Sequence, residues 1–151
     1  MNRSRITRVV TKGLVKTYGF TVALRGVDVT IDEAELTLIE GANGSGKSTL
    51  LGILGTVLRP TSGTVLYEPL GDDLNEVRHE VGWLSHESMT YPDLSGRKNI
   101  ELAASIVGMS MEDVWERVAD RFELGAFALR PVRTYSRGQK QRVALARALV
   151  H

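Results

Sequence analysis

A glycine-rich segment in the first third of the chain constrains the fold more than any other feature. Residues 41–48 read G-A-N-G-S-G-K-S, which fits the pattern G-x-x-x-x-G-K-[ST]. Glycines leave backbone N–H groups uncrowded, so such a loop can wrap a phosphate, and the N-terminus of the following helix adds partial positive charge. In this pattern Lys47 reaches the β- and γ-phosphates and the Ser48 hydroxyl ligates Mg²⁺. The motif predicts a strand, a phosphate-binding loop and a helix in direct succession.

The flanking residues agree with this succession. The short run 36–39 (L-T-L-I) shows little alternation, as expected of a strand buried on both faces in a parallel sheet. Residues 47–58 carry too many apolar side chains for a one-sided helix, which predicts a buried helix. Ahead of them, residues 6–14 and 22–31 mix β-branched residues with turn signals and predict antiparallel strands.

The rest of the chain predicts two more strands and three helices. The strands are expected at residues 64–67 and 81–84, and the helices at about 95–107, 111–122 and 137–150. Ser110 and Asp113 form a capping pair at the start of the second of these helices. This pattern predicts an α/β chain with antiparallel strands near its N-terminus and helices in its second half.

Composition excludes several classes of protein. The 151 residues are 42% apolar and 25% charged, as in ordinary soluble domains. The formal net charge is +1, which argues against a nucleic-acid partner. Without cysteine the chain has no disulfide framework and no thiolate metal site. No apolar run approaches the ~20 residues of a membrane span, and none follows the basic residues 1–5, so we expect no signal peptide.

A phosphate-binding loop alone leaves GTPases, kinases, helicases and transport ATPases open. The chain contains no N-K-x-D segment of the kind that reads guanine, which disfavours a GTPase.

A second motif near the C-terminal end narrows the choice. Residues 133–149 read R-T-Y-S-R-G-Q-K-Q-R-V-A-L-A-R-A-L. Ser136 and the Gly138 amide are expected at the N-terminus of a helix, where a second phosphate contact can form. The segment resembles the signature segment and helix of ATP-binding-cassette (ABC) ATPases, with Y-S-R-G-Q as a variant of the family's L-S-G-G-Q.

Three shorter segments extend this resemblance over residues 6–151. Tyr18, in K-T-Y-G, stands where the family places an aromatic ring that stacks on adenine. Residues 81–87 (V-G-W-L-S-H-E) resemble the segment ending in the family's Q-loop, with His86 where most members have glutamine. Residues 94–100 (L-S-G-R-K-N-I) resemble the L-T-x-x-E-N-L that follows it.

The resemblance implies an ABC-type P-loop NTPase core that binds ATP with Mg²⁺. This is an α/β fold in which a mixed sheet with N-terminal antiparallel strands is joined to a helical subdomain. It places the metal on Ser48, whereas the imidazole of His86 is a poor ligand for Mg²⁺, which prefers oxygen. The nucleotide-binding residues that it implies are Tyr18, Gly41, Asn43, Gly44, Ser45, Gly46, Lys47, Ser48, Thr49, His86, Ser136, Gly138 and Gln139.

The resemblance also implies partners. Two copies, or two paired cassettes, would sandwich two ATP molecules, with Ser136 and Gly138 acting on the nucleotide of the other copy. A transmembrane permease subunit would be driven by this dimer, which places the chain in the cytoplasm on the inner face of the cell membrane. Lys98 replaces an acidic residue on the face that the family turns toward its membrane partner.

The chain stops at His151, where the family continues into the Walker B aspartate and the catalytic glutamate. No hydrophobic run ending in Asp-Glu occurs upstream, so the resemblance assigns no catalytic residue to this chain. We expect a nucleotide-binding domain incomplete at its C-terminus. Its parts would be an ATP-binding core at about 1–80, a Q-loop and helical subdomain at about 81–136, and the signature helix at 137–151.

Three functional hypotheses follow. The first is a transporter ATPase: S-H-E at 85–87 and Y-P-D-L at 91–94 resemble the haem-exporter subunit of cytochrome c biogenesis, and a drug, lipid or polysaccharide exporter is the alternative. The second, preferred for these residues alone, is a nucleotide-binding fragment without turnover. The third, an ABC ATPase of translation or DNA repair, is disfavoured because no second cassette or long coiled-coil insert is present.

Overall fold

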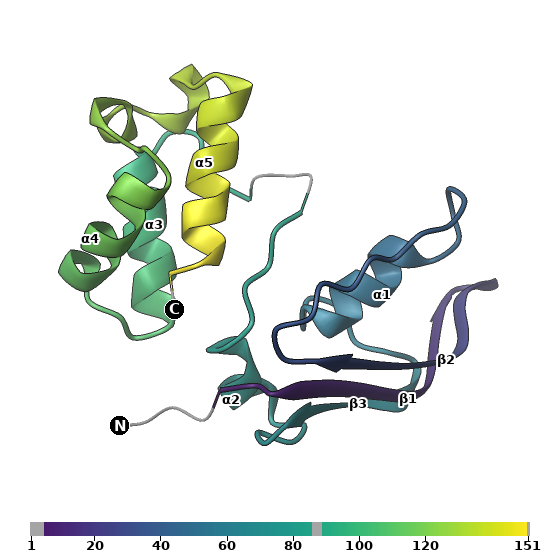
Figure 1. Ribbon diagram of the computed structural model, residues 1–151. Coiled ribbons are helices and arrows are strands. Elements are labelled where there is room, and N and C mark those ends of the chain that lie inside the picture. The colour runs from purple at the N-terminus through teal and green to yellow at the C-terminus, as the bar shows by residue number, and fades with distance from the viewer. Residues whose placement is uncertain (1–4, 86–88, 151) are drawn as a thin grey trace. The chain divides into compact units, whose positions relative to one another are not determined.

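The computed structural model describes residues 5–85 and 89–150. Its contacts divide the chain into two compact units, Met1–Val81 and Gly82–His151, which we call the strand unit and the helical unit (Figure 1).

The strand unit is built on an antiparallel sheet. Its strands are β1 (Arg8–Tyr18), β2 (Thr21–Asp32) and β3 (Ser62–Glu68), in the order β2-β1-β3. A tight turn joins β1 to β2, so that Tyr18 pairs with Thr21. The antiparallel strands expected in the first 31 residues and the strand expected at 64–67 are confirmed.

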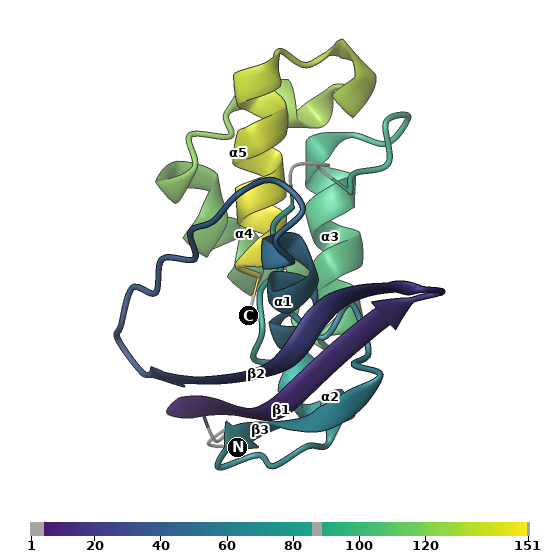
Figure 2. The same ribbon diagram turned by 90° about the vertical axis from the view of Figure 1, so that its right-hand side faces the viewer.

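Helix α1 (Lys47–Leu54) packs on one face of this sheet (Figures 1 and 2). Four buried side chains form the centre of the contact: Leu14 and Leu24 from the strands, and Leu50 and Ile53 from the helix. The Tyr67 hydroxyl of β3 donates to the Leu54 carbonyl (2.9 Å), one of the carbonyls that a helix end leaves without a partner. A short helix, α2 (Leu74–Arg78), follows β3 and was not expected.

Three expectations in this unit and at its boundary are wrong. Residues 36–39 and 81–84 form no strand, and Leu36 and Leu38 are 99% and 77% exposed. A strand needs a neighbour to bond its backbone, and the three strands of the described residues pair only with one another. Helix α1 ends at Leu54 rather than near residue 58, because the chain turns back and Leu58 packs against Gly52.

The helical unit consists of three α-helices and two short 3₁₀ turns. The helices are α3 (Gly96–Ile106), α4 (Met111–Arg121) and α5 (Arg137–Ala148), and the turns are η1 (Ala126–Leu129) and η2 (Val132–Thr134). The three expected helices are confirmed to within two residues at each end. The largest side chains of its core are Ile100, Val107, Val114, Val118, Leu124, Val132, Tyr135, Val143 and Val150.

A serine caps each of these helices. The hydroxyl oxygens of Ser95, Ser110 and Ser136 accept the backbone N–H of Lys98, Asp113 and Gln139, respectively. Each cap satisfies one of the N–H groups that a helix start leaves without a partner. Among the described residues, no helix combines the length and apolar character that crossing a membrane requires.

Candidate functional site

The glycine-rich loop leads into α1 through a conformation that only glycine adopts easily. Gly46 is the N-cap of α1 and has a φ of 94°. A Cβ atom at Gly46 would lie 2.5 Å from the Ala23 carbonyl oxygen and 2.9 Å from a methyl carbon of Leu24. A Cβ at Gly41 would lie 2.8 Å from the Ser45 hydroxyl oxygen. The glycines therefore let the loop pass close to β2 and close on itself.

The start of α1 is favourable for an anion. No side chain caps its N-terminus and its first turn contains no acidic residue. The N–H groups and the helix dipole at this end are therefore not neutralised by a neighbouring carboxylate. Ser48 and Thr49 belong to the same first turn, and Ser48 is exposed.

Lys47 brings a positive charge onto the loop. Its Nζ atom donates to the carbonyl oxygens of Gly41 (2.7 Å) and Ala42 (2.8 Å). Lys47 is half-buried, whereas Asn43, Gly44 and Ser45 are exposed. Its ammonium therefore lies on the carbonyl oxygens at the start of the loop, and it is the lysine that the pattern assigns to the phosphates.

Tyr18 ends β1 in the same unit as the loop. Its side chain is 48% exposed, and Lys16 Nζ lies 5.1 Å from the centre of its ring. A tyrosine this exposed can stack one face of its ring on a flat heterocycle, as stacking of adenine on Tyr18 requires.

In the helical unit, Ser136 and Gln139 form a reciprocal cap at the start of α5. The Ser136 hydroxyl accepts the Gln139 N–H (3.3 Å), and the Gln139 side-chain oxygen accepts the Ser136 N–H (3.1 Å). Gly138 is exposed, and a Cβ there would meet no atom within 4 Å. The start of α5 thus offers open space beside a helix N-terminus, while the Gln139 amide is already engaged.

The expected site residues therefore fall into two sets. Tyr18 and the loop residues lie in the strand unit, whereas Ser136, Gly138 and Gln139 lie in the helical unit. His86, which the sequence placed at the Q-loop position, lies outside the described residues.

One residue that organises the helical unit was not singled out from the sequence. Asn99 is fully buried, and its side-chain oxygen accepts the Tyr91 N–H (2.7 Å). Its side-chain nitrogen donates to the carbonyls of Tyr91 (3.0 Å) and Ser95 (3.0 Å). The signal was present in the L-S-G-R-K-N-I segment, but a polar residue on a helix ordinarily indicates a solvent-facing position.

The loop also fits a magnesium nucleotide. Mg²⁺ is held through one or two protein oxygens together with phosphate oxygens, and the exposed Ser48 hydroxyl can supply one. Within the described residues, no group of three or more His, Asp or Glu side chains is placed to hold a metal by itself.

Comparison with known proteins agrees with this geometry. The family model described as ABC transporter matches residues 24–151. This chain belongs to the ABC transporter family. Its α/β fold, with antiparallel N-terminal strands and a helical unit, is the ABC cassette fold, as expected from the sequence.

Relatives of this cassette have several different roles. The sn-glycerol-3-phosphate import ATP-binding protein UgpC of Ruegeria sp. (strain TM1040) is 35% identical over 94% of this chain and 42% of its own length. The pyoverdine export ATP-binding/permease protein PvdT of Pseudomonas savastanoi pv. phaseolicola is 38% identical over 85% of the chain and 21% of PvdT. The lipoprotein-releasing system ATP-binding protein LolD 1 of Caulobacter vibrioides is 36% identical over 87% of the chain and 61% of LolD 1. The chain thus spans less than two thirds of each of these relatives.

A solved structure matches almost the whole of this chain. The ATP-binding cassette MJ0796, as a dimer in a post-hydrolysis state bound to ADP and Pi, superposes with a TM-score of 0.82 and 32% identity. The match covers 94% of this chain and 69% of MJ0796.

Proposed function

We propose that this cassette binds Mg-ATP, with the phosphates on residues 41–48 and the adenine on Tyr18. The observation that carries the proposal is a helix start without side-chain cap or carboxylate, seated on Ala23 through Gly46, with the Lys47 ammonium bonded to the loop that leads into it. Bound Mg²⁺ would neutralise the phosphate charge, and Ser48 would supply its protein ligand. Asn43, Gly44, Ser45 and Thr49 line the same loop and first turn.

We propose further that the nucleotide is shared between two cassettes. Ser136 and Gly138 of one copy would contact the terminal phosphate held by the loop of the other, since the start of α5 is open at Gly138. The dimeric state of MJ0796 supports this arrangement. Gln139 would first have to leave its cap on Ser136 if its side chain is also to contact nucleotide.

In the transporter, closing of this dimer around ATP would drive a separate transmembrane permease subunit, a population shift that follows from differential ATP affinity. This function places the cassette in the cytoplasm at the inner face of the cell membrane. Hydrolysis of ATP needs a residue that positions the attacking water, and the family assigns this role to a glutamate outside these residues. For the 151 residues alone we propose nucleotide binding without turnover.

The cargo is proposed only as a class. The relatives named above import sn-glycerol 3-phosphate, export pyoverdine or release lipoproteins, so they do not favour one cargo. Haem export is supported by the resemblance at residues 85–87 and 91–94, and export of a drug, lipid or polysaccharide is the alternative. Co-purification of the permease subunit, followed by transport of haem into vesicles with the loss expected for Lys47→Ala, would distinguish the two.

Calorimetric titration with Mg-ATP tests the nucleotide site. Lys47→Ala should weaken binding by at least about tenfold, because it removes a charge-assisted contact to phosphate. Lys12→Ala is the matched control, since Lys12 is an exposed lysine of β1 in the same unit. Equal affinities of the Lys47→Ala variant and the wild type would overturn the proposal.

A further inference from the structure

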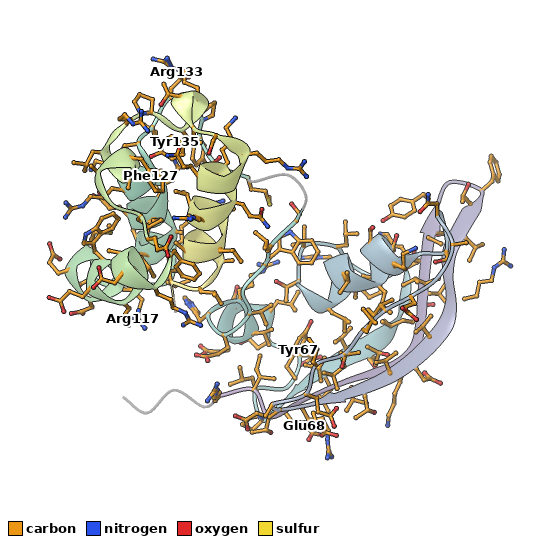
Figure 3. The ribbon with its side chains drawn as sticks, turned by 45° about the horizontal axis from the view of Figure 1, so that its top comes forward. Tyr67, Glu68, Arg117, Phe127, Arg133 and Tyr135 are labelled. Carbon is orange, nitrogen blue, oxygen red and sulfur yellow. The ribbon has the colours of Figure 1, made fainter. Side chains whose placement is uncertain are left out.

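Tyr135, the residue before the cap of α5, is buried although it ends in a polar group. Its side chain is 6% exposed. Its ring meets the edge of Phe127 with the ring centres 5.2 Å apart and the planes at 87°, and Figure 3 shows the two side by side. At this position the signature of the family has leucine, which fills space but makes no hydrogen bond. In this chain a hydroxyl therefore stands where that pattern has none.

The Tyr135 hydroxyl joins two other segments to the start of α5. Its oxygen accepts the N–H of Gly96, the first residue of α3 (3.0 Å), and its proton is donated to the Arg130 carbonyl (3.0 Å). Burial raises the pKa of Tyr135, so the hydroxyl keeps its proton and can donate and accept at once. The hydroxyl thus makes one hydrogen bond as an acceptor and one as a donor within the protein.

Gly96 is shaped to receive this hydroxyl. A Cβ atom there would lie 2.7 Å from the Tyr135 oxygen and 3.0 Å from a methyl carbon of Val143 on α5. Contact this close leaves no room for a side chain, so the start of α3 packs directly on both Tyr135 and Val143. A movement of Tyr135 would therefore change the contact between the two helices.

The same two segments are also bonded through their backbones. The Val132 N–H donates to the Leu94 carbonyl (3.0 Å) and the Arg133 N–H donates to the Pro92 carbonyl (2.8 Å). The Arg133 guanidinium pairs with the Asp93 carboxylate (3.2 Å). Residues 92–96 and 130–135 thus form one bonded layer, and the Tyr135 hydroxyl is its last bond before Ser136.

We infer that the Tyr135 hydroxyl is a positioning group for the start of α5: it fixes where Ser136 and the Gly138 amide lie and so sets the affinity of ATP-dependent dimer formation. The inference rests on the proposed shared nucleotide. Tyr135 itself touches no nucleotide in this proposal and acts through Ser136. A purely space-filling tyrosine would instead be replaceable by phenylalanine without any effect at α5.

The experiment compares Tyr135→Phe with Tyr67→Phe in the whole protein. Both changes delete one buried hydroxyl that donates to a backbone carbonyl, but Tyr67 belongs to the strand unit (Figure 3). Tyr135→Phe should lower the urea midpoint more than Tyr67→Phe does, because it also leaves the Gly96 N–H without its acceptor. Tyr135→Leu has the residue of the family pattern and should show the same effect at α5 as Tyr135→Phe, together with a further loss of folding stability because the ring contact with Phe127 is gone.

The first readout is amide hydrogen exchange in the nucleotide-free protein. In Tyr135→Phe the amides of Gly96, Gln139 and Lys140 should exchange about fivefold faster, as expected for the loss of one hydrogen bond that orders the segment. Tyr67→Phe should leave these three amides unchanged. Faster exchange at Gly96 alone would overturn the inference, because the bond would then be local and would not order α5.

The second readout is ATP-dependent dimerisation followed by sedimentation. Tyr135→Phe should weaken the dimer about fivefold while the affinity of the monomer for a fluorescent ATP analogue stays within about twofold of wild type. An unchanged dimer affinity would overturn the positioning role. If the wild type itself forms no dimer with ATP, the proposal that two cassettes share the nucleotide is wrong. The inferred effect of Tyr135 on dimer affinity is then wrong as well. Hydrogen exchange would still decide whether Tyr135 orders the start of α5.

Discussion

The α-carbon of Gly46 lies so close to the carbonyl oxygen of Ala23 that a methyl group on Gly46 would have no space. This contact seats the loop on β2, and Gly46 combines it with a left-handed φ.

Gly46→Ala should therefore destabilise the protein by at least about 2 kcal/mol, the sum of a left-handed alanine and a forced displacement of β2. Urea unfolding measures the loss. Gly44→Ala is the matched control in the same loop: its φ is also positive, at 82°, but a Cβ there would meet nothing within 4 Å. A Gly44→Ala loss as large as that of Gly46→Ala would contradict the role of the Ala23 contact.

The Ser136 cap has an internal control in Ser110. Ser136→Arg and Ser110→Arg should each cost about 1 kcal/mol of stability, because each removes an N-cap hydrogen bond. Only Ser136→Arg should abolish ATP-dependent dimerisation, since only α5 would face the nucleotide of the other copy. Monomer affinity for ATP should change little in both variants, and a dimer that survives Ser136→Arg would refute the contact across the dimer.

Asn99→Leu should cost about 1 to 3 kcal/mol, because it leaves the Tyr91 N–H without its acceptor and removes the side-chain donor of the Tyr91 and Ser95 carbonyls, which keep only their backbone donors. The free energy of unfolding in urea is the measurement. Asn75→Leu, at an exposed asparagine of α2, should stay within about 0.5 kcal/mol of wild type. Equal losses of folding stability in the two variants would mean that the buried amide of Asn99 does not stabilise the segment around Tyr91.

Alkaline unfolding should report on Tyr67. Burial raises the pKa of Tyr67 from 10.0 to about 12 in the folded protein. Between these values the unfolded chain releases the phenolic proton and the folded protein keeps it, so the stability that this group contributes is full below pH 10 and falls as pH rises toward 12. The slope for one such group is up to about 1.4 kcal/mol per pH unit.

Tyr67→Phe should remove that part of the slope when the pH dependence of stability is compared with wild type. Tyr91→Phe, at an exposed tyrosine, serves as the control. A slope unchanged by Tyr67→Phe would show that Tyr67 does not titrate differently in the folded and unfolded states.

The features that could be predicted from the sequence are those set by neighbours along the chain. Ser110 and Ser136 indicate helix starts, and the glycine-lysine pattern indicates the turn at Gly46. Helix caps and left-handed turns depend only on residues close by in the sequence, so they can be predicted from it. Residues 36–39 were predicted as a strand from their apolar character, but a strand forms only when another lies beside it. The Tyr135 hydroxyl is bonded to Gly96, 39 residues away along the chain, so no local pattern reveals its role. Asn99 is bonded within eight residues, but a polar residue on a helix does not by itself indicate that it is buried.

The exposure of Leu36 and Leu38 has a practical consequence for work with the isolated chain. Two exposed apolar side chains, one residue apart, on a stretch of backbone that belongs to no strand are a place where a second molecule can pair. Concentrated preparations should self-associate through this stretch regardless of nucleotide. Charged replacements such as Leu36→Lys should keep such preparations colloidally stable, and any association that remains and requires ATP then reports on the cassette dimer alone.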